Sequence, residues 1–265
     1  MQKRRLRSAG GLSQTCRSPG ACMNSDQSPR AWLEDYPLQA SEQLFAIFSN
    51  ASSAGALSAW RRSMNSTASP IWADTPYAEW EAVMPYVGLV SADSGFLDWV
   101  AASDSLDWGW LAVSCVSQET LAEHLRGLTQ VLLPGGKPVF LRFWDGRFVR
   151  PILQSTAVEA GQLLPVIKRC LINGQSLEVV GNAQRPAQAF PWWQVPVALL
   201  DAMAEGPTDC LLDNLLAWLG EEHPYVSERV DRSILRCKIA HFLERSEPVE
   251  VKKAPLQAYL LRELG

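Results

Sequence analysis

The sequence predicts an α/β protein: an N-terminal lobe built on a mixed sheet with flanking helices, followed by an all-helical C-terminal lobe. Two observations lead to this class. Between residues 38 and 180, short apolar runs typical of buried strands alternate with stretches of helical periodicity. After residue 190 the pattern is helical only. Because 47% of the 265 residues are hydrophobic and 20% are charged, the chain can bury a core of this size.

The first lobe, 38–180, is predicted to alternate strands and helices. Strands are predicted where short apolar runs are bounded by polar residues or turns, at 44–48, 85–90 and 110–115. Helices are predicted at 54–64, at 96–100, after Ser117 and at 157–171. In the third of these, Ser117 is the predicted N-cap, and the apolar stripe consists of Leu121, Leu125 and Leu128.

A β-hairpin is predicted around the turn Pro134-Gly135-Gly136-Lys137. Its strands are expected at 131–133 and 139–144, and Asp145-Gly146 is expected to end it. The two glycines are explained by this turn, since they are too few to form a phosphate-binding loop.

The end of this hairpin carries a notable group of residues. In an alternating strand, Arg142 and Trp144 share one face and Phe143 points to the other. Asp145 and Arg147 then lie at the strand end, where an ion pair can hold the turn together. We favour this structural role over catalysis. The functional interpretation is a surface that faces a partner, because Arg and Trp are enriched in binding hot spots.

Residues 181–191 are predicted to be a linker, because they are rich in Gly, Asn, Pro, Gln and Ala. The helical lobe is predicted to span 192–265. Its helices are expected at 194–204, 208–220, 225–245 and 255–264. The second has an apolar face made of Leu211, Leu212, Leu215, Leu216 and Leu219.

The charge is unevenly distributed along the chain. Residues 1–22 carry five bases and no acid, although the whole chain has a net charge of −4. This basic head has no apolar core of a secretory signal, and its Arg and Ser content resembles a transit peptide. We expect residues 1–30 to be disordered, or the natural start to lie at Met23. The remaining, acidic body argues against nucleic acid as a partner.

Composition also points to a compartment. The six cysteines form no CxxC pair and no disulfide framework, so we expect reduced thiols and a cytoplasmic protein. No window approaches the roughly 18 consecutive apolar residues of a membrane helix, so we expect no membrane partner.

Motifs of catalysis and cofactor binding are not found. The three histidines are far apart and lie in no HExxH or Cys/His cluster, so no metal is predicted. The sequence has no GxSxG, Walker or GxGxxG motif, so we predict no cofactor and no enzymatic activity. Carboxylates such as Asp145 leave a carboxylate-based hydrolase open as an alternative.

Several short motifs follow one another between residues 41 and 155. In chain order they are Ile71-Trp72-Ala73-Asp74-Thr75-Pro76-Tyr77, Met84-Pro85-Tyr86-Val87, Trp108-Gly109, His124-Leu125-Arg126, Leu133-Pro134-Gly135-Gly136 and Leu141-Arg142-Phe143-Trp144-Asp145-Gly146-Arg147. In order and spacing they resemble the type VI secretion effector chaperone (adaptor) family, the domain of unknown function 4123 type. Met84 stands where the family usually has Gly, and Gly146 stands where it usually has Pro.

The resemblance implies a cytoplasmic adaptor or chaperone. Such a protein binds a cognate secreted effector encoded nearby, stabilises it, and loads it onto a spike protein of the VgrG or PAAR type. No cofactor, nucleic acid or membrane is implied. A third possibility is an immunity-type protein that binds and neutralises a toxin.

An adaptor needs exposed apolar or aromatic surface that pairs with a partner. The candidate interaction residues are Trp72, Tyr77, Trp80, Arg142, Trp144, Asp145, Arg147, Trp192 and Trp193. For the aromatic residues the alternative is packing in the core, which we expect for about half of them. Because Trp192 and Trp193 lie between two prolines at a predicted lobe junction, we expect at least one of these two rings to be partly exposed.

Overall fold

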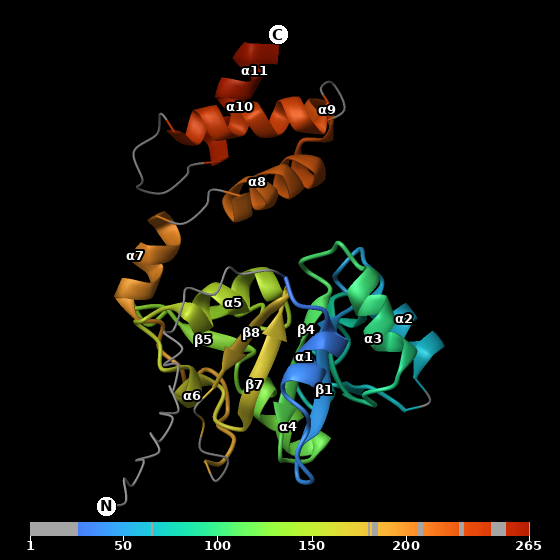
Figure 1. The fold of residues 1–265 in the computed structure, drawn as a ribbon. Coiled ribbons are helices and arrows are strands. Elements are labelled where there is room, and N and C mark those ends of the chain that lie inside the picture. Colours follow the sequence, from blue (N-terminus) through green and yellow to red (C-terminus); the bar gives the residue numbers. More distant parts are fainter. Residues whose placement is uncertain are drawn as a thin grey trace, which may run out of the picture.

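The structure is a computed structural model, and it describes residues 26–64, 66–179, 181, 185–205, 209–227, 231–244 and 253–264. A six-stranded sheet with helices on both faces is followed by further helices toward the C-terminus (Figure 1). The predicted class, an α/β lobe with flanking helices and a helical C-terminal region, is confirmed. The basic head of residues 1–22 lies outside the described residues.

The main sheet has the strand order β2-β3-β1-β4-β7-β8. Its strands are β1 (Gln43–Ser49), β2 (Ser69–Pro70), β3 (Pro85–Val90), β4 (Gly109–Ser114), β7 (Ile167–Ile172) and β8 (Gln175–Glu178). Every described pairing within it is antiparallel, so the strands are not of mixed direction. The predicted strands 44–48, 85–90 and 110–115 correspond to β1, β3 and β4.

The sheet is buried on both faces, and β1 shows why. Side chains alternate along a strand, so Phe45 and Ile47 enter one core while Leu44 and Phe48 enter the other. A strand covered on both faces reads as a continuous apolar run, and this run made β1 recognisable in the sequence.

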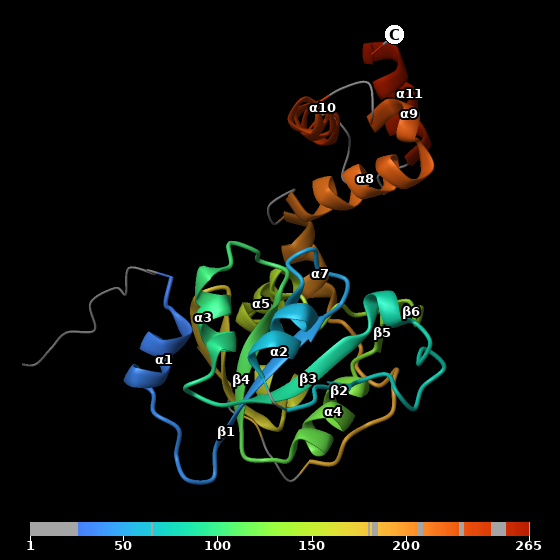
Figure 2. The ribbon, with the colours of Figure 1, turned by 90° about the vertical axis from the view of Figure 1, so that its right-hand side faces the viewer.

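Helices form the outer layers (Figures 1 and 2). One face packs against α1 (Pro29–Asp35), α2 (Ala56–Ser63) and α3 (Gly95–Ala102). The other packs against α4 (Gln118–Arg126), α5 (Gly146–Gln154), α6 (Ala160–Leu163) and a hairpin of β5 (Gln130–Leu132) and β6 (Pro138–Phe140). The predicted helices at 54–64, at 96–100 and after Ser117 are confirmed as α2, α3 and α4. Ser117 caps α4, since its Oγ accepts a hydrogen bond from the backbone N–H of Thr120 at 3.2 Å.

Helix α1 was not predicted, and it begins inside the range 1–30 for which we expected disorder. Ser28 is its N-cap and Pro29 its first residue, a combination that favours helix initiation. Trp32 is completely buried, and its Nε1 donates a hydrogen bond to Ser176 Oγ on β8 at 2.9 Å. The packed structure therefore begins before residue 38, the predicted start of the lobe.

The predicted helix at 157–171 is wrong. Only the short α6 forms there, and residues from Ile167 onward form the hairpin of β7 and β8. The two strands are joined by Asn173 and Gly174, whose φ angles are 49° and 73°. Two successive positive φ values are what the tightest two-residue hairpin turn requires, and Asn-Gly is the pair that adopts them most readily.

The predicted strand 139–144 is also wrong in its second half. β6 ends at Phe140, and the chain then turns into α5, for which Asp145 is the N-cap. Phe143 and Trp144 do not point to opposite faces. Both are buried in the same core, and their rings are 5.1 Å apart. The backbone beyond β6 is held in this position by Trp110 on β4, whose Nε1 donates a hydrogen bond to the carbonyl oxygen of Phe143 at 2.8 Å.

The chain leaving the predicted linker packs on the α/β lobe. Leu132 of β5 donates its N–H to the carbonyl oxygen of Trp193 and accepts the N–H of Val195, both at 2.8 Å. Val195 and Leu199 are buried in the same core as α4 and α5. Thus the first residues of the predicted helical lobe, including the start of α7 (Val197–Glu205), are part of the α/β packing.

The remaining helices have a core of their own. They are α8 (Asp209–Glu222), α9 (Pro224–Ser227), α10 (Arg232–Glu244) and α11 (Lys253–Leu264). Buried leucines of α8 pack with Leu235 and Ile239 of α10 and with Leu256 and Leu260 of α11. The helix predicted at 225–245 corresponds to α9 and α10. Among the residues that the structure describes, no helix has the length and apolar character needed to cross a membrane.

Candidate protein-interaction site

Aromatic rings from distant parts of the chain meet beside the β5–β6 hairpin. We call this group the aromatic cluster, and it consists of Trp72, Tyr77, Trp80, Phe140, Trp144 and Phe190. Neighbouring ring centroids lie between 4.9 and 6.3 Å apart, in edge-to-face or tilted arrangements. These geometries are the favoured ones for aromatic pairs.

The base of the aromatic cluster is buried. Trp72 is 1% exposed and Trp144 is 5% exposed. Trp72 also donates a hydrogen bond from Nε1 to Thr129 Oγ1 at 3.0 Å, so its polar atom is satisfied inside the core. For these two candidates, the alternative of core packing is what the structure shows.

The rim of the aromatic cluster is exposed. Trp80 is 47% exposed and Phe140 is 41% exposed, and their ring centroids are 5.6 Å apart. Tyr77 lies between them and the core, half-buried, and its Oη accepts a hydrogen bond from Gln130 Nε2 at 2.9 Å. We call Trp80 and Phe140 the aromatic rim. Neighbouring large apolar side chains that are exposed to solvent and packed on a buried cluster are typical of a surface that binds another molecule.

The loop that carries Trp80 is held in place by local hydrogen bonds. Thr75 Oγ1 donates to the carbonyl oxygen of Trp72 at 2.9 Å and accepts the N–H of Tyr77 at 3.1 Å. Arg126 of α4 donates from Nε to the carbonyl oxygen of Ile71 at 2.7 Å. A hollow of about 400 Å³ lies beside this loop, lined in part by Asp74, Pro76, Glu123 and Phe190. The rim is therefore a formed surface and not a loose loop.

Three other candidates, Arg142, Asp145 and Arg147, form a separate ionic group. Asp145 is 1% exposed. Its Oδ2 lies 2.8 Å from Arg147 Nη2 and 3.4 Å from Arg142 Nη2, and its Oδ1 accepts the backbone N–H of Arg147 at 3.0 Å. The predicted ion pair is thus present, but it caps the start of α5 and does not close a strand end.

A second acid joins this group. Asp107 Oδ2 lies 3.5 Å from Arg147 Nη2, and Asp107 Oδ1 accepts hydrogen bonds from Ser52 and Ser105. Burial alone would raise the pKa of Asp107, but the two serine hydroxyls and the Arg147 charge outweigh it and hold the pKa below its ordinary value. Asp107 is therefore ionised at neutral pH, whereas a carboxylic acid catalyst needs a raised pKa. The Asp107 carboxyl is therefore not prepared to act as a general acid.

Trp192 and Trp193 lie in the segment that crosses the α/β lobe. Both side chains are half-buried, as we expected for at least one of them. The Arg185 guanidinium lies over the Trp192 ring at 5.5 Å. The segment passes close to Gly127, where an added Cβ would lie 2.3 Å from the carbonyl oxygen of Gln188. The backbone of this segment thus packs closely against the C-terminal end of α4, where only a glycine leaves enough space.

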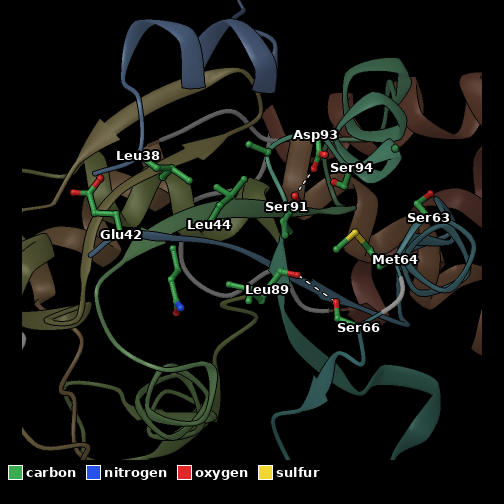
Figure 3. A pocket seen from close by; sticks show the side chains of 14 residues that line it. Leu38, Glu42, Leu44, Ser63, Met64, Ser66, Leu89, Ser91, Asp93 and Ser94 are labelled. Carbon is green, nitrogen blue, oxygen red and sulfur yellow. Dashed lines mark hydrogen bonds between the residues drawn. The ribbon is translucent and has the colours of Figure 1, made fainter. Parts of the chain in front are cut away.

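A further cavity, of about 770 Å³, lies where β1 begins and β3 ends (Figure 3). Leu44, Met64 and Leu89 line it together with serines and two acids, Glu42 and Asp93. Glu42 is bound by Lys168 at 3.1 Å and by Arg169 at 3.0 Å. Burial acts to raise the pKa of Glu42, but hydrogen bonds from Gln39, Lys168 and Arg169 lower it by more.

The Asp93 carboxylate is likewise held by the Ser91 hydroxyl, which lowers its pKa. Both acids of this cavity are therefore ionised at neutral pH and occupied by contacts within the chain. Over the part of the chain that is described, no group of three or more His, Cys, Asp or Glu side chains is placed to hold a metal ion.

The structure brings four of the predicted residues together, Trp72, Tyr77, Trp80 and Trp144. The ionic group directly follows Trp144 in the chain and the Trp192–Trp193 pair lies just after Phe190, but among the described residues neither takes part in the ring contacts of the aromatic cluster. Sequence reasoning missed two members of the aromatic cluster, Phe140 and Phe190. Phe140 lay in a predicted hairpin strand, where an aromatic residue beside a turn could have been read as exposed. Phe190 lay in the predicted linker, whose composition gave no sign of packing.

Comparison with known proteins matches part of the chain to a protein family. Residues 44–162 match the model of a protein family described as a domain of unknown function (DUF4123). The matched segment runs from β1 to α6, and it contains the aromatic rim and the ionic group but ends before Phe190 and Trp192. No curated protein and no solved structure matches the chain.

Proposed function

We propose that the protein is a cytoplasmic adaptor or chaperone of a type VI secretion system. It binds a cognate effector protein encoded nearby, stabilises it before secretion, and delivers it to a spike protein of the VgrG or PAAR type. It acts by binding and not by catalysis, and it needs no cofactor.

The observation that carries the proposal is the aromatic rim. Trp80 and Phe140 are exposed by 47% and 41%, yet they rest on a buried aromatic base that fixes their positions. A preorganised aromatic surface loses little conformational entropy on binding, which suits it to hold a partner protein. The motif resemblance over residues 41–155 supports the same role, and it overlaps the segment 44–162 that matches the family model.

Co-expression tests the proposal. The chain is produced together with the product of the adjacent large open reading frame, and the soluble yield and co-purification of that product are measured. We expect the product to be soluble and retained in the presence of this chain, and to be depleted in its absence. A product that is soluble alone and does not co-purify would contradict the proposal.

Two variants link the result to the surface. Trp80→Ala combined with Phe140→Ala removes the aromatic rim and is expected to abolish co-purification. The matched control is Leu106→Ala, which removes an exposed apolar side chain (57% exposed) from the loop between α3 and β4. An immunity-type protein would also bind its partner, but it would inhibit the toxicity of the partner without raising its soluble level or its secretion.

A further inference from the structure

The loop that carries Trp80 is acidic. Glu79 and Glu81 flank Trp80 in the chain, and both are exposed. Asp74 lies in the same loop with a side chain that is 86% exposed. Residues 73–84 contain no Lys or Arg. Trp80 is therefore flanked in the chain by two exposed carboxylates, and a third lies in the same loop.

These carboxylates are largely available to a partner. Asp74 has a base nearby, Arg126, but the closest atoms of the pair are 3.8 Å apart. Among the described residues, no Lys or Arg forms an ion pair with Glu79 or Glu81. Lys137, in the turn of the hairpin that carries Phe140, is an exposed base, so the acidic character is strongest on the Trp80 side.

Exposed aromatic rings beside carboxylates favour one kind of side chain. The face of a Trp ring attracts a cation more strongly than that of any other side chain. A guanidinium can lie flat on such a ring while its edge donates two parallel hydrogen bonds to a carboxylate. Contacts between a guanidinium and an aromatic ring also occur within the chain. The guanidinium carbon of Arg185 lies 5.5 Å from the centroid of the Trp192 ring, and that of Arg142 lies 5.1 Å from the centroid of the Phe148 ring.

We infer that the aromatic rim binds a segment of the partner protein that carries an Arg or Lys next to an apolar side chain. The base lies over Trp80 or Phe140 and faces Glu79 and Glu81, while the apolar neighbour packs against Tyr77. This inference rests on the proposed function and names the chemistry of its partner. An acidic segment is rejected by the same surface, because like charges then approach each other across the interface.

The test measures the dissociation constant (Kd) of the purified product of the adjacent large open reading frame for the full-length chain. The informative variant is Glu79→Lys combined with Glu81→Lys. Its matched control is Glu34→Lys combined with Asp104→Lys, which changes the net charge equally. Glu34 and Asp104 are exposed and lie on or beside α1 and α3, on the opposite side of the lobe from β6 (Figure 2). Circular dichroism confirms that each variant is folded.

We expect the Glu79→Lys/Glu81→Lys variant to bind about tenfold more weakly than the wild type, with the control within about twofold. Raising the NaCl concentration from about 50 to about 300 mM should weaken the wild type more than the double variant, because salt screens attraction between exposed charges. Trp80→Ala should weaken binding by at least about thirtyfold, as expected for an aromatic hot spot.

The outcomes separate this inference from the proposed function. If Trp80→Ala weakens binding but the charge reversal does not, the partner is apolar at this surface and the inference is wrong, while the adaptor role stands. If neither variant weakens the binding of a tightly bound product, the aromatic rim is not the contact surface and the inference is wrong; the adaptor role then rests on the binding itself and no longer on the rim. If the wild type does not bind the product at all, both are wrong.

Discussion

Trp72 and Trp144 are far apart in the chain and pack edge to face, with ring centroids 5.3 Å apart and ring planes at 81°. Trp72 also contacts Trp80 and Phe140, each at 6.3 Å. One buried ring thus joins the core of the lobe to the two exposed rings of the aromatic rim. Residues that share a chemical type and lie in one cluster therefore have different roles, which substitution can separate.

The first prediction concerns the base of the aromatic cluster. Trp144→Ala should lower the free energy of unfolding by about 3–5 kcal/mol, since it leaves a cavity in the core. Trp80→Ala should lower it by at most about 1.5 kcal/mol, the contribution of a lost aromatic pair at the surface. Urea unfolding followed by circular dichroism measures both. Equal losses would show that Trp80 is part of the packed core and not of a binding surface.

The second prediction concerns Asp145, which both caps α5 and pairs with Arg147. Asp145→Ala should lower the free energy of unfolding by about 2–5 kcal/mol, because it removes a helix cap and a charge-assisted hydrogen bond. Asp145→Asn keeps an oxygen that can cap the helix, so its loss should be smaller. If the two variants are equally unstable, the ion pair dominates and the cap contributes little.

The strands that were predicted correctly from the sequence are those marked by a continuous run of apolar residues. β1 and β4 are apolar on both faces, and such a run between polar residues leaves few alternatives. The helix at 157–171 failed because β7 (IKRCLI) places Lys168 and Arg169 among its apolar residues, so it lacks the continuous apolar run of β1 and β4. The deciding signal was present in Asn173-Gly174, the most specific hairpin turn that a sequence offers.

The candidate site was only partly predictable, for a different reason. Trp72 and Tyr77 share one motif and Trp80 follows it by three residues, so the sequence could place them together. Their contact with Phe140 and Phe190 depends on how the hairpin and the crossing segment pack, which no local pattern specifies. The same holds for exposure. Trp72 and Trp80 are equally apolar residues in one loop, yet one is 1% exposed and the other 47%.

The third prediction concerns the segment that crosses α4. Trp192→Ala or Trp193→Ala should weaken binding of the partner while the α/β lobe remains folded, since both side chains are half-buried at the surface. Affinity is measured with the adjacent gene product, and folding by circular dichroism. Val197→Ala is the control, because this side chain is 58% exposed and lies close by in α7. Unchanged affinity in a folded variant would remove Trp192 and Trp193 from the list of interaction residues.

The fourth prediction concerns pH and Asp107. Burial raises its pKa, but the hydroxyls of Ser105 and Ser52 and the charge of Arg147 lower it by more, so the pKa in the folded protein lies below the ordinary 3.8. When the pKa of a carboxyl is lower in the folded protein than in the unfolded chain, its ionised form stabilises the fold. This stabilisation is complete at pH values above the pKa of the unfolded chain, and it is lost as the pH falls through the pKa of the folded protein. Asp107→Asn removes it, so the variant should be less stable than the wild type at neutral pH.

The difference in the free energy of unfolding between wild type and Asp107→Asn should therefore be constant from about pH 7 to about pH 5 and shrink below about pH 4. Urea unfolding at several pH values measures it. Asp104→Asn, an exposed acid in the same loop, should show little difference from the wild type at any pH. If the Asp107→Asn difference does not shrink in acid, the loss comes from the packing of the amide, and the contacts with Ser52, Ser105 and Arg147 do not depend on the charge of Asp107.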